Sequence, residues 1–177
     1  MNDRIRSITT KSGDEGRTRL FSGEEVSKDS VRTEACGDLD ELVSTLGVAR
    51  SLARHEVVRA GVEDLQRRLF LAGAELATTL EQVDRLEARI GAEHLEDLDR
   101  KREAIEGHIP WPGGFVIPGA TPAAAHLDLA RAVARRLERR VVGLCEAGEL
   151  NNDLLRAWMN RLSDYLWLLA RWEEREE

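Results

Sequence analysis

The fold is decided by the stretch Leu155–Arg171, which reads LRAWMNRLSDYLWLLAR. Large apolar side chains recur in it at spacings of three and four, which is typical of the buried face of an α-helix. They are Leu155, Trp158, Leu162, Leu166 and Leu169. Asn151 is a suitable N-cap for this helix, which we expect to continue to about Arg171. The spacing therefore predicts a long helix with one apolar stripe, the kind of element from which helical bundles are built.

Four more helices are predicted upstream from the same periodicity. We expect them from Glu34 onward, over about 55–80, more weakly over about 86–106, and from Thr121-Pro122 to about Ala147. The last of these opens with an N-cap followed by proline, and Gly148 is placed to end it. The first two carry the stripes Leu39, Leu42, Leu46, Ala49 and Leu52, and Val58, Val62, Leu65, Leu69, Ala72 and Leu76. Short connections between long amphipathic helices predict an all-α fold, an antiparallel five-helix bundle.

Two segments have no helical pattern. Residues 108–120 contain three prolines and three glycines, which excludes a regular helix. Residues 1–32 form a glycine-containing arm that is too long to be structureless in a compact domain unless it has a function. We therefore expect one domain over residues 1–177, with an arm at 1–32 and a bundle at 33–173.

Composition excludes several classes of protein. The chain has 177 residues and a formal net charge of −7, which argues against nucleic-acid binding but allows a local cluster of cations for a small anion. Cys36 and Cys145 form no CxxC pair, so we expect neither a zinc site nor a disulfide scaffold, and a cytoplasmic location is the default. They are more typical of helix-packing residues than of nucleophiles. No apolar run approaches the ~20 residues of a membrane span, and the N-terminus does not resemble a secretory signal.

The arm contains the sequence TKSGDEGRT at Thr10–Thr18. Glycines that allow close approach of the backbone, together with a lysine and hydroxyl groups, suit a polyphosphate-binding loop. The order of a Walker A loop is absent. The alternative is a flexible arm with turn-forming residues, which composition alone favours.

Two helix faces are further candidates. Arg131, Arg135 and Glu138 share one face of the fourth helix and suit phosphate or carboxylate binding, although a solvated charged face is the simpler interpretation. On the last helix a polar stripe lies opposite the apolar one: Asn160, Asp164, Trp167 and Arg171. This stripe favours contact with a partner chain or ligand, or else packing of the tryptophan within the bundle.

Acidic residues gather in the first helix at Asp38, Asp40 and Glu41. They could hold a divalent ion or pair with arginines. No HxxxH or ExxH pair is present, and neither a Ser-His-Asp nor a Cys-His arrangement can be found.

Four segments, in this order, resemble the ATP:cob(I)alamin adenosyltransferases of the trimeric PduO type. They are TKSGDEGRTRL at 10–20, VSKD at 26–29 with GDLDEL at 37–42, FVIPG at 115–119 with ARAVARRLER at 130–139, and NRLSDYL at 160–166. Together they span about residues 9–171. The chain departs from the usual pattern at Cys36, Ala120 and Trp167.

The resemblance implies a homotrimeric five-helix bundle that transfers the 5′-deoxyadenosyl group of ATP to reduced cobalt, giving adenosylcobalamin and triphosphate. It also implies a site between subunits, with Mg²⁺ on the ATP phosphates and no protein residue assigned as a ligand of that metal. The implied ATP-binding residues are Thr10, Lys11, Gly13, Asp14, Gly16, Thr18, Lys28, Arg135, Glu138 and Asn160. Asp40 and Arg131 match a pair that forms a salt bridge between subunits, and Phe115 matches an aromatic residue that displaces the lower axial ligand of the corrinoid. Asp164 is assigned a structural role.

The resemblance further implies a reductase that supplies reduced corrinoid and an adenosylcobalamin-dependent acceptor enzyme. The main alternative is a non-catalytic ATP- or corrinoid-binding carrier or sensor, and a ligand-free helical scaffold is a third possibility. The sequence leaves two places for Phe115, the bundle core or the face of the corrinoid.

Overall fold

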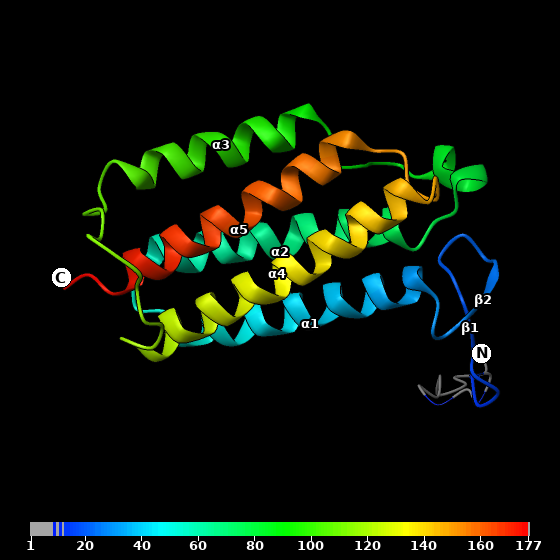
Figure 1. The fold of residues 1–177 in the computed structure, drawn as a ribbon, viewed down its shortest axis with the longest axis horizontal. Helices are drawn as coiled ribbons and strands as arrows, with labels where there is room; N and C mark the ends of the chain where they lie inside the picture. The colour runs from blue at the N-terminus through cyan, green and yellow to red at the C-terminus, as the bar shows by residue number, and fades with distance from the viewer. Residues whose placement is uncertain (1–8, 10, 12, 177) are drawn as a thin grey trace, which may run out of the picture.

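Five long helices form a bundle, with a short β-hairpin at one end (Figure 1). The computed structural model describes residues 9, 11 and 13–176. Within them the elements are β1 (Arg17–Arg19), β2 (Glu25–Ser27), α1 (Val31–Leu52), α2 (Glu56–Leu76), the 3₁₀-helix η1 (Leu80–Arg85), α3 (Ala92–Glu106), α4 (Pro122–Glu146) and α5 (Asp153–Glu173). The prediction of a mainly helical protein is confirmed.

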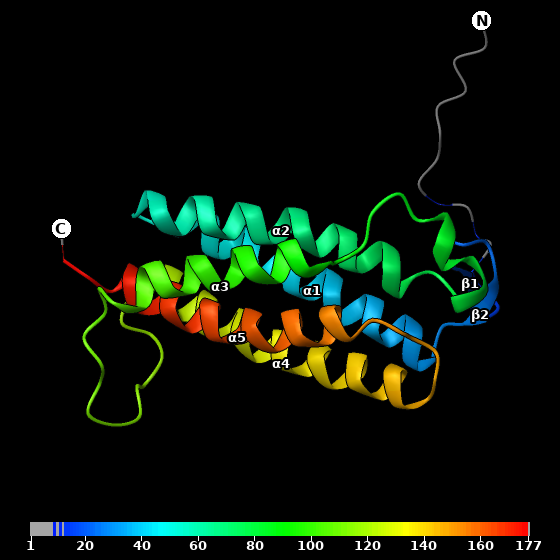
Figure 2. The same ribbon diagram turned by 90° about the horizontal axis from the view of Figure 1, so that it is seen from above.

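Successive α-helices run in opposite directions (Figures 1 and 2). The helix α4 packs on α1 and on α5, while α2 packs on α1 and α3 on α5. The predicted stripe of α5 lies in the shared core, and its members are all fully buried: Leu155, Trp158, Leu162, Leu166 and Leu169. The predicted stripe of α2 is buried in the same way. On α1 the expectation for Leu52 is wrong: it is 45% exposed, because the chain turns there and the next residue, Ala53, is buried instead.

Helix ends follow the expected chemistry with two corrections. Thr121 caps α4 by accepting a hydrogen bond from the backbone N–H of Ala124, at 3.1 Å, and Gly148 after α4 has a φ of +69°. The N-cap of α5 is Asn152 rather than Asn151, because the Asn152 Oδ1 accepts from the N–H groups of two following residues. The second helix ends at Leu76, and its carbonyl there accepts a hydrogen bond from the buried Arg32 guanidinium.

The region expected as the start of the third helix differs most. The 3₁₀-helix η1 and a connecting segment occupy residues 80–91, and α3 begins only at Ala92. The connection is held by Arg89, which donates to the fully buried Glu75 carboxylate. A buried carboxylate needs a partner for its charge, and the contact with Arg89 keeps this segment from continuing α3 toward its N-terminus.

The hairpin was not predicted from the sequence. Its strands are antiparallel, with Thr18 opposite Val26, and Gly23 in the turn has a φ of +103°. The turn is attached to the end of α2, since the Ser22 backbone N–H donates to the Ala77 carbonyl at 3.4 Å. This attachment orders part of the arm.

The arm and the Pro/Gly-rich loop lie at opposite ends of the bundle (Figures 1 and 2). The hairpin is beside the start of α1, whereas the loop over residues 107–121 is beside the C-terminal end of α5. No helix in the described part of the chain is long and apolar enough to cross a membrane.

Candidate active site

A tight turn and one lysine organise the described part of the arm. The Lys28 ammonium donates to the Gly13 carbonyl at 2.6 Å, and the Lys28 backbone N–H donates to the Gly16 carbonyl at 2.9 Å. A side chain at Gly13 would meet the Lys28 Nζ at 2.7 Å, and Gly16 has a φ of +79° that favours glycine. The glycines therefore let the backbone close around an exposed ammonium group, an arrangement suited to an anion.

The other arm residues implied by the resemblance lie around this turn. Lys11 and Asp14 are exposed, and Thr18 is half-buried in β1. Thr10 falls outside the described residues.

A second group of expected residues meets across α4 and α5. The Asn160 Nδ2 donates to the Glu138 carboxylate at 2.9 Å, and the Arg135 guanidinium lies 3.5 Å from the Ser163 hydroxyl. Arg135 is exposed, so its guanidinium can still bind a ligand. The structure thus brings Arg135, Glu138 and Asn160 together on one face.

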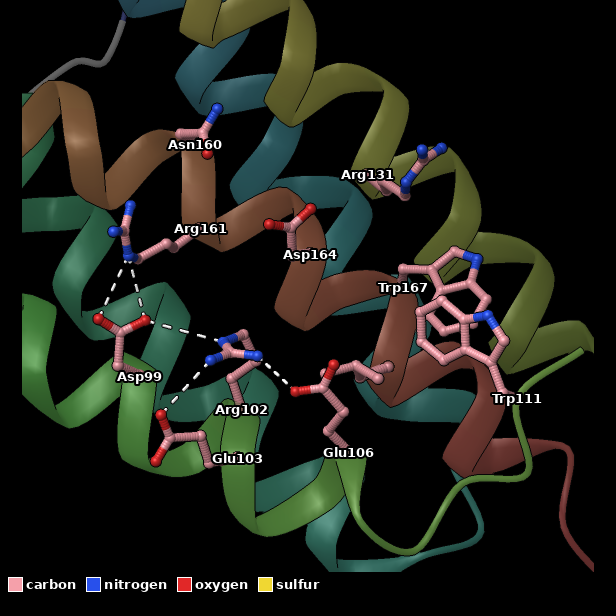
Figure 3. Close-up of a pocket in the computed structure, with 11 residues that line it drawn as sticks. Asp99, Arg102, Glu103, Glu106, Trp111, Arg131, Asn160, Arg161, Asp164 and Trp167 are labelled. Atoms are coloured by element: carbon pink, nitrogen blue, oxygen red, sulfur yellow. Dashed lines mark hydrogen bonds and ion pairs between the residues drawn. The ribbon is translucent and has the colours of Figure 1, made fainter.

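A groove of about 770 Å³ opens beside this face, between α3, α4 and α5 (Figure 3). Its lining residues are Asp99, Arg102, Glu103, Glu106, Trp111, Arg131, Asn160, Arg161, Asp164, Trp167 and Leu168. Arg131 and Asn160 were expected at a site, whereas the α3 residues and Trp111 were not. The charged pattern of α3 gave no signal for them, because their place depends on how α3 packs against α5.

Some charged side chains around the groove form ion pairs with one another, and others do not (Figure 3). Arg102 pairs with Glu106 and Asp99, and Arg161 lies 3.1 Å from the Asp99 carboxylate. Within the described residues, Arg131 and Asp164 form no ion pair. Asp164, to which a structural role was assigned, is exposed and lines the groove. Among the residues that the structure describes, Arg131 and Asp164 are therefore a cation and a carboxylate of the groove that remain available to a ligand.

The three acidic residues of α1 differ in whether they form ion pairs. Arg136 pairs with Asp38 at 2.9 Å and also with Glu41, and these carboxylates raise the pKa of the Arg136 guanidinium. The pairing with arginines, one of the two expectations, thus holds for Asp38 and Glu41. Asp40 is exposed and forms no ion pair with the residues that the structure describes. Those residues contain no cluster of three potential His, Cys, Asp or Glu metal ligands.

Two expectations for single side chains are corrected by burial. Arg171 is not on an exposed stripe: it is only 7% exposed and pairs with Asp128 and Glu174. Phe115 is fully exposed, so a place in the core of its own chain is wrong. Trp167 is half-buried against Trp111, which agrees with packing inside the bundle.

Neither cysteine resembles a nucleophile. Cys36 and Cys145 are free thiols, and burial raises the pKa of both. Since the thiolate is the reactive form, a raised pKa lowers reactivity at neutral pH.

The chain is similar to known proteins along nearly its whole length. The chain is 40% identical to a corrinoid adenosyltransferase of Citrobacter freundii, and the match covers 94% of each protein. It is 39% identical to the corrinoid adenosyltransferase PduO of Salmonella typhimurium, but covers only 50% of that longer protein.

Solved structures give the same result. A variant of the PduO-type ATP:corrinoid adenosyltransferase from Lactobacillus reuteri, complexed with cobalamin and ATP, has a TM-score of 0.85 and 32% identity, covering 95% of this chain and 93% of that one. A second variant, complexed with ATP, has a TM-score of 0.84 at the same identity. The family described as cobalamin adenosyltransferase matches residues 8–173. The chain therefore belongs to the cobalamin adenosyltransferase family.

Proposed function

We propose that this protein transfers the 5′-deoxyadenosyl group of ATP to the cobalt of cob(I)alamin, giving adenosylcobalamin and triphosphate. The observation that carries the proposal is the match along nearly the whole chain to a relative named corrinoid adenosyltransferase. A similar solved structure holds both ATP and cobalamin. The exposed cations Lys28 and Arg135 and the half-buried Arg131 are available to bind an anionic substrate, which supports the proposal.

The chemistry requires no nucleophile from the protein. Reduced cobalt attacks the 5′-carbon of ATP with its electron pair, the C–O bond breaks, and triphosphate leaves with that bond's electrons. The protein has to align the two substrates and stabilise negative charge on the leaving oxygen. Lys28 and Arg135 suit this task, since both are exposed cations beside backbone or side-chain groups that orient them. Mg²⁺ would be held mainly by phosphate oxygens and water.

We further propose that the site lies between subunits of a homotrimer. Two observations support this assembly. The arm and the loop that carries Phe115 are at opposite ends of one chain (Figure 1), and Asp40 and Arg131 each lack an ion-pair partner within its described residues. A neighbouring copy could supply both the missing partner and the missing half of the site. In this arrangement the arm of one subunit faces Arg135, Glu138 and Asn160 of the next.

The assembly has a direct test in sedimentation. The family resemblance implies a trimer, so we expect a species of about three times the 19.9 kDa chain mass with or without ATP. Sedimentation equilibrium at micromolar concentration measures this mass. A fully active monomer would contradict the shared site.

For the corrinoid we propose the groove and the adjacent loop. Trp111 and Trp167 give the groove one aromatic wall, and the fully exposed Phe115 follows on the same loop. A large apolar side chain exposed in this way is suited to cover the lower face of a corrinoid and keep out water and the lower ligand.

The function itself is tested by an anaerobic assay with chemically reduced cobalamin and ATP. We expect the spectrum of adenosylated cobalamin to appear in proportion to enzyme, and to appear far more slowly with Arg135→Ala. The alternative, a carrier or sensor, predicts binding of ATP or corrinoid without this spectrum. Binding without turnover would therefore overturn the proposal.

The surroundings of the enzyme follow from the reaction. Cob(I)alamin is strongly reducing, so a reductase has to supply it, and an adenosylcobalamin-dependent enzyme has to accept the product. The two free thiols are compatible with a reducing compartment, and we propose the cytoplasm and a single domain over residues 1–177.

A further inference from the structure

A buried ion pair supports the aromatic wall of the groove. On α5, the Arg171 Nη2 lies 2.7 Å from the Asp128 carboxylate of α4, and both side chains are almost fully buried. The Arg171 guanidinium also pairs with Glu174 at 2.8 Å. The central carbon of the guanidinium lies 5.4 Å from the centre of the Trp167 ring. Its contacts with Asp128, Glu174 and this ring hold the guanidinium in one orientation.

Trp167 in turn contacts the loop. Its ring centre lies 5.6 Å from that of Trp111, with 52° between the planes. Both rings line the groove, Trp167 half-buried and Trp111 still 75% exposed (Figure 3). The series Arg171, Trp167 and Trp111, which we call the aromatic stack, therefore runs from the bundle interior to the loop.

The loop has few other attachments. Across the described chain, no hydrogen bond or ion pair involves residues 110–120. The contact of Trp111 with Trp167 is the ring contact that joins this segment to the bundle. Phe115 is only four residues after Trp111, and a chain spans at most ~3.6 Å per residue, so fixing the loop at Trp111 keeps Phe115 within about 14 Å of it, although Gly113 and Gly114 allow the link to bend.

We propose that Trp111 and Arg171 are positioning residues: the aromatic stack holds the loop so that Phe115 is presented beside the groove. The consequence for catalysis rests on the proposed function, whereas the stack itself does not. Trp111 acts through the loop, and Arg171 acts through Trp167.

The stack is tested first without any ligand, by chymotryptic cleavage after Phe115. Chymotrypsin cleaves after aromatic residues but not where a proline follows, as it does after Trp111, so Phe115 is the cleavable aromatic residue of the loop. An aromatic pair of this kind lowers the equilibrium constant for opening of a segment by about 2- to 12-fold. We therefore expect chymotrypsin to cleave the loop of Trp111→Ala faster by that factor. Arg171→Lys, which keeps a cation for Asp128 but loses the flat stacking surface, should give a smaller increase.

Arg175→Ala is the matched control. Arg175 also lies over a tryptophan of the same helix, 4.3 Å from the centre of Trp172, but that ring contacts His108 at the start of the loop rather than Trp111, and it does not line the groove. We expect chymotrypsin to cleave the loop of the Arg175→Ala variant at the wild-type rate. Equal cleavage rates in Trp111→Ala and wild type would overturn the stack as an anchor.

The second readout is the kinetic split of the same variants. We expect Trp111→Ala to have a higher KM for corrinoid and a lower kcat, with an unchanged KM for ATP and an unchanged melting temperature. Bound cob(II)alamin should retain more of its lower ligand, as its spectrum reports. Faster cleavage with wild-type corrinoid kinetics would contradict the positioning role. If the wild-type protein does not adenosylate cobalamin at all, the proposed function fails, and the cleavage rates still decide whether the stack holds the loop.

Discussion

Phe115→Ala is expected to lower turnover by roughly 10- to 150-fold, the equivalent of the ~1.5–3 kcal/mol gained by burying a phenylalanine against a ligand. The physical reason is that Phe115 has no contact to lose in its own chain, where it is fully exposed. Its apolar surface becomes useful only when the corrinoid or a neighbouring subunit covers it. We therefore expect the free energy of unfolding to change by no more than about 0.5 kcal/mol, as for other surface residues.

Thermal melting and the spectrum of bound cob(II)alamin, recorded on the same variant, measure both parts of this prediction. The lower ligand should stay on cobalt in Phe115→Ala, while the KM for ATP stays at its wild-type value. Phe70→Ala is a matched control, since Phe70 is 67% exposed on α2 and does not line the groove. A loss of ~3–5 kcal/mol of stability would instead indicate a core residue. A variant that still removes the lower ligand would contradict the proposed role of Phe115 at the corrinoid.

The sequence was most informative about the buried faces of the helices. Spacings of three and four report which side of a helix is buried, and this is why the stripe from Leu155 to Leu169 was predicted residue by residue. Thr121 and Gly148 were predictable for a related reason, because the chemistry of a helix end is local.

Contacts between distant elements were not predictable in this way. The strands β1 and β2 have only three residues each, too few for a periodic pattern, and they depend on an attachment to the end of α2. Arg171 fits an exposed stripe by spacing alone, yet its partner Asp128 lies on another helix. The α3 side of the groove was missed for the same reason.

Lys28→Ala and Arg135→Ala form the second large prediction. Each removes a cation that faces the proposed triphosphate position, and a lost hydrogen bond to a charged group typically costs ~1.5–3 kcal/mol, or roughly 10- to 150-fold. We expect this loss in kcat/KM for ATP, with little change in melting temperature. In the described chain Lys28 donates to one carbonyl in the arm, and Arg135 is exposed on α4.

Rates at limiting ATP measure this effect. Arg67→Ala is the control, because Arg67 is an exposed arginine on α2 whose partner is Glu63. It should keep the wild-type rate. Wild-type rates for Lys28→Ala and Arg135→Ala at limiting ATP would show that these two cations do not form the ATP site.

The central claim, that one chain contributes the arm and its neighbour contributes the α4 and α5 face, is tested most directly by mixing these two variants. Each variant alone is expected to have little activity at limiting ATP. The Lys28→Ala and Arg135→Ala chains are co-expressed in equal amounts with different tags. Half of the arms and half of the α4 faces are then intact. If the chains assemble at random into trimers, about a quarter of all sites combine an intact arm with an intact α4 face and so have both cations. We predict that the whole co-expressed population regains about a quarter of the wild-type rate at limiting ATP, and that mixed trimers isolated by both tags regain about a third, because one of the three sites in each has both cations. Mixed trimers that stay as inactive as their parents would place Lys28 and Arg135 in the site of one chain and contradict the shared site.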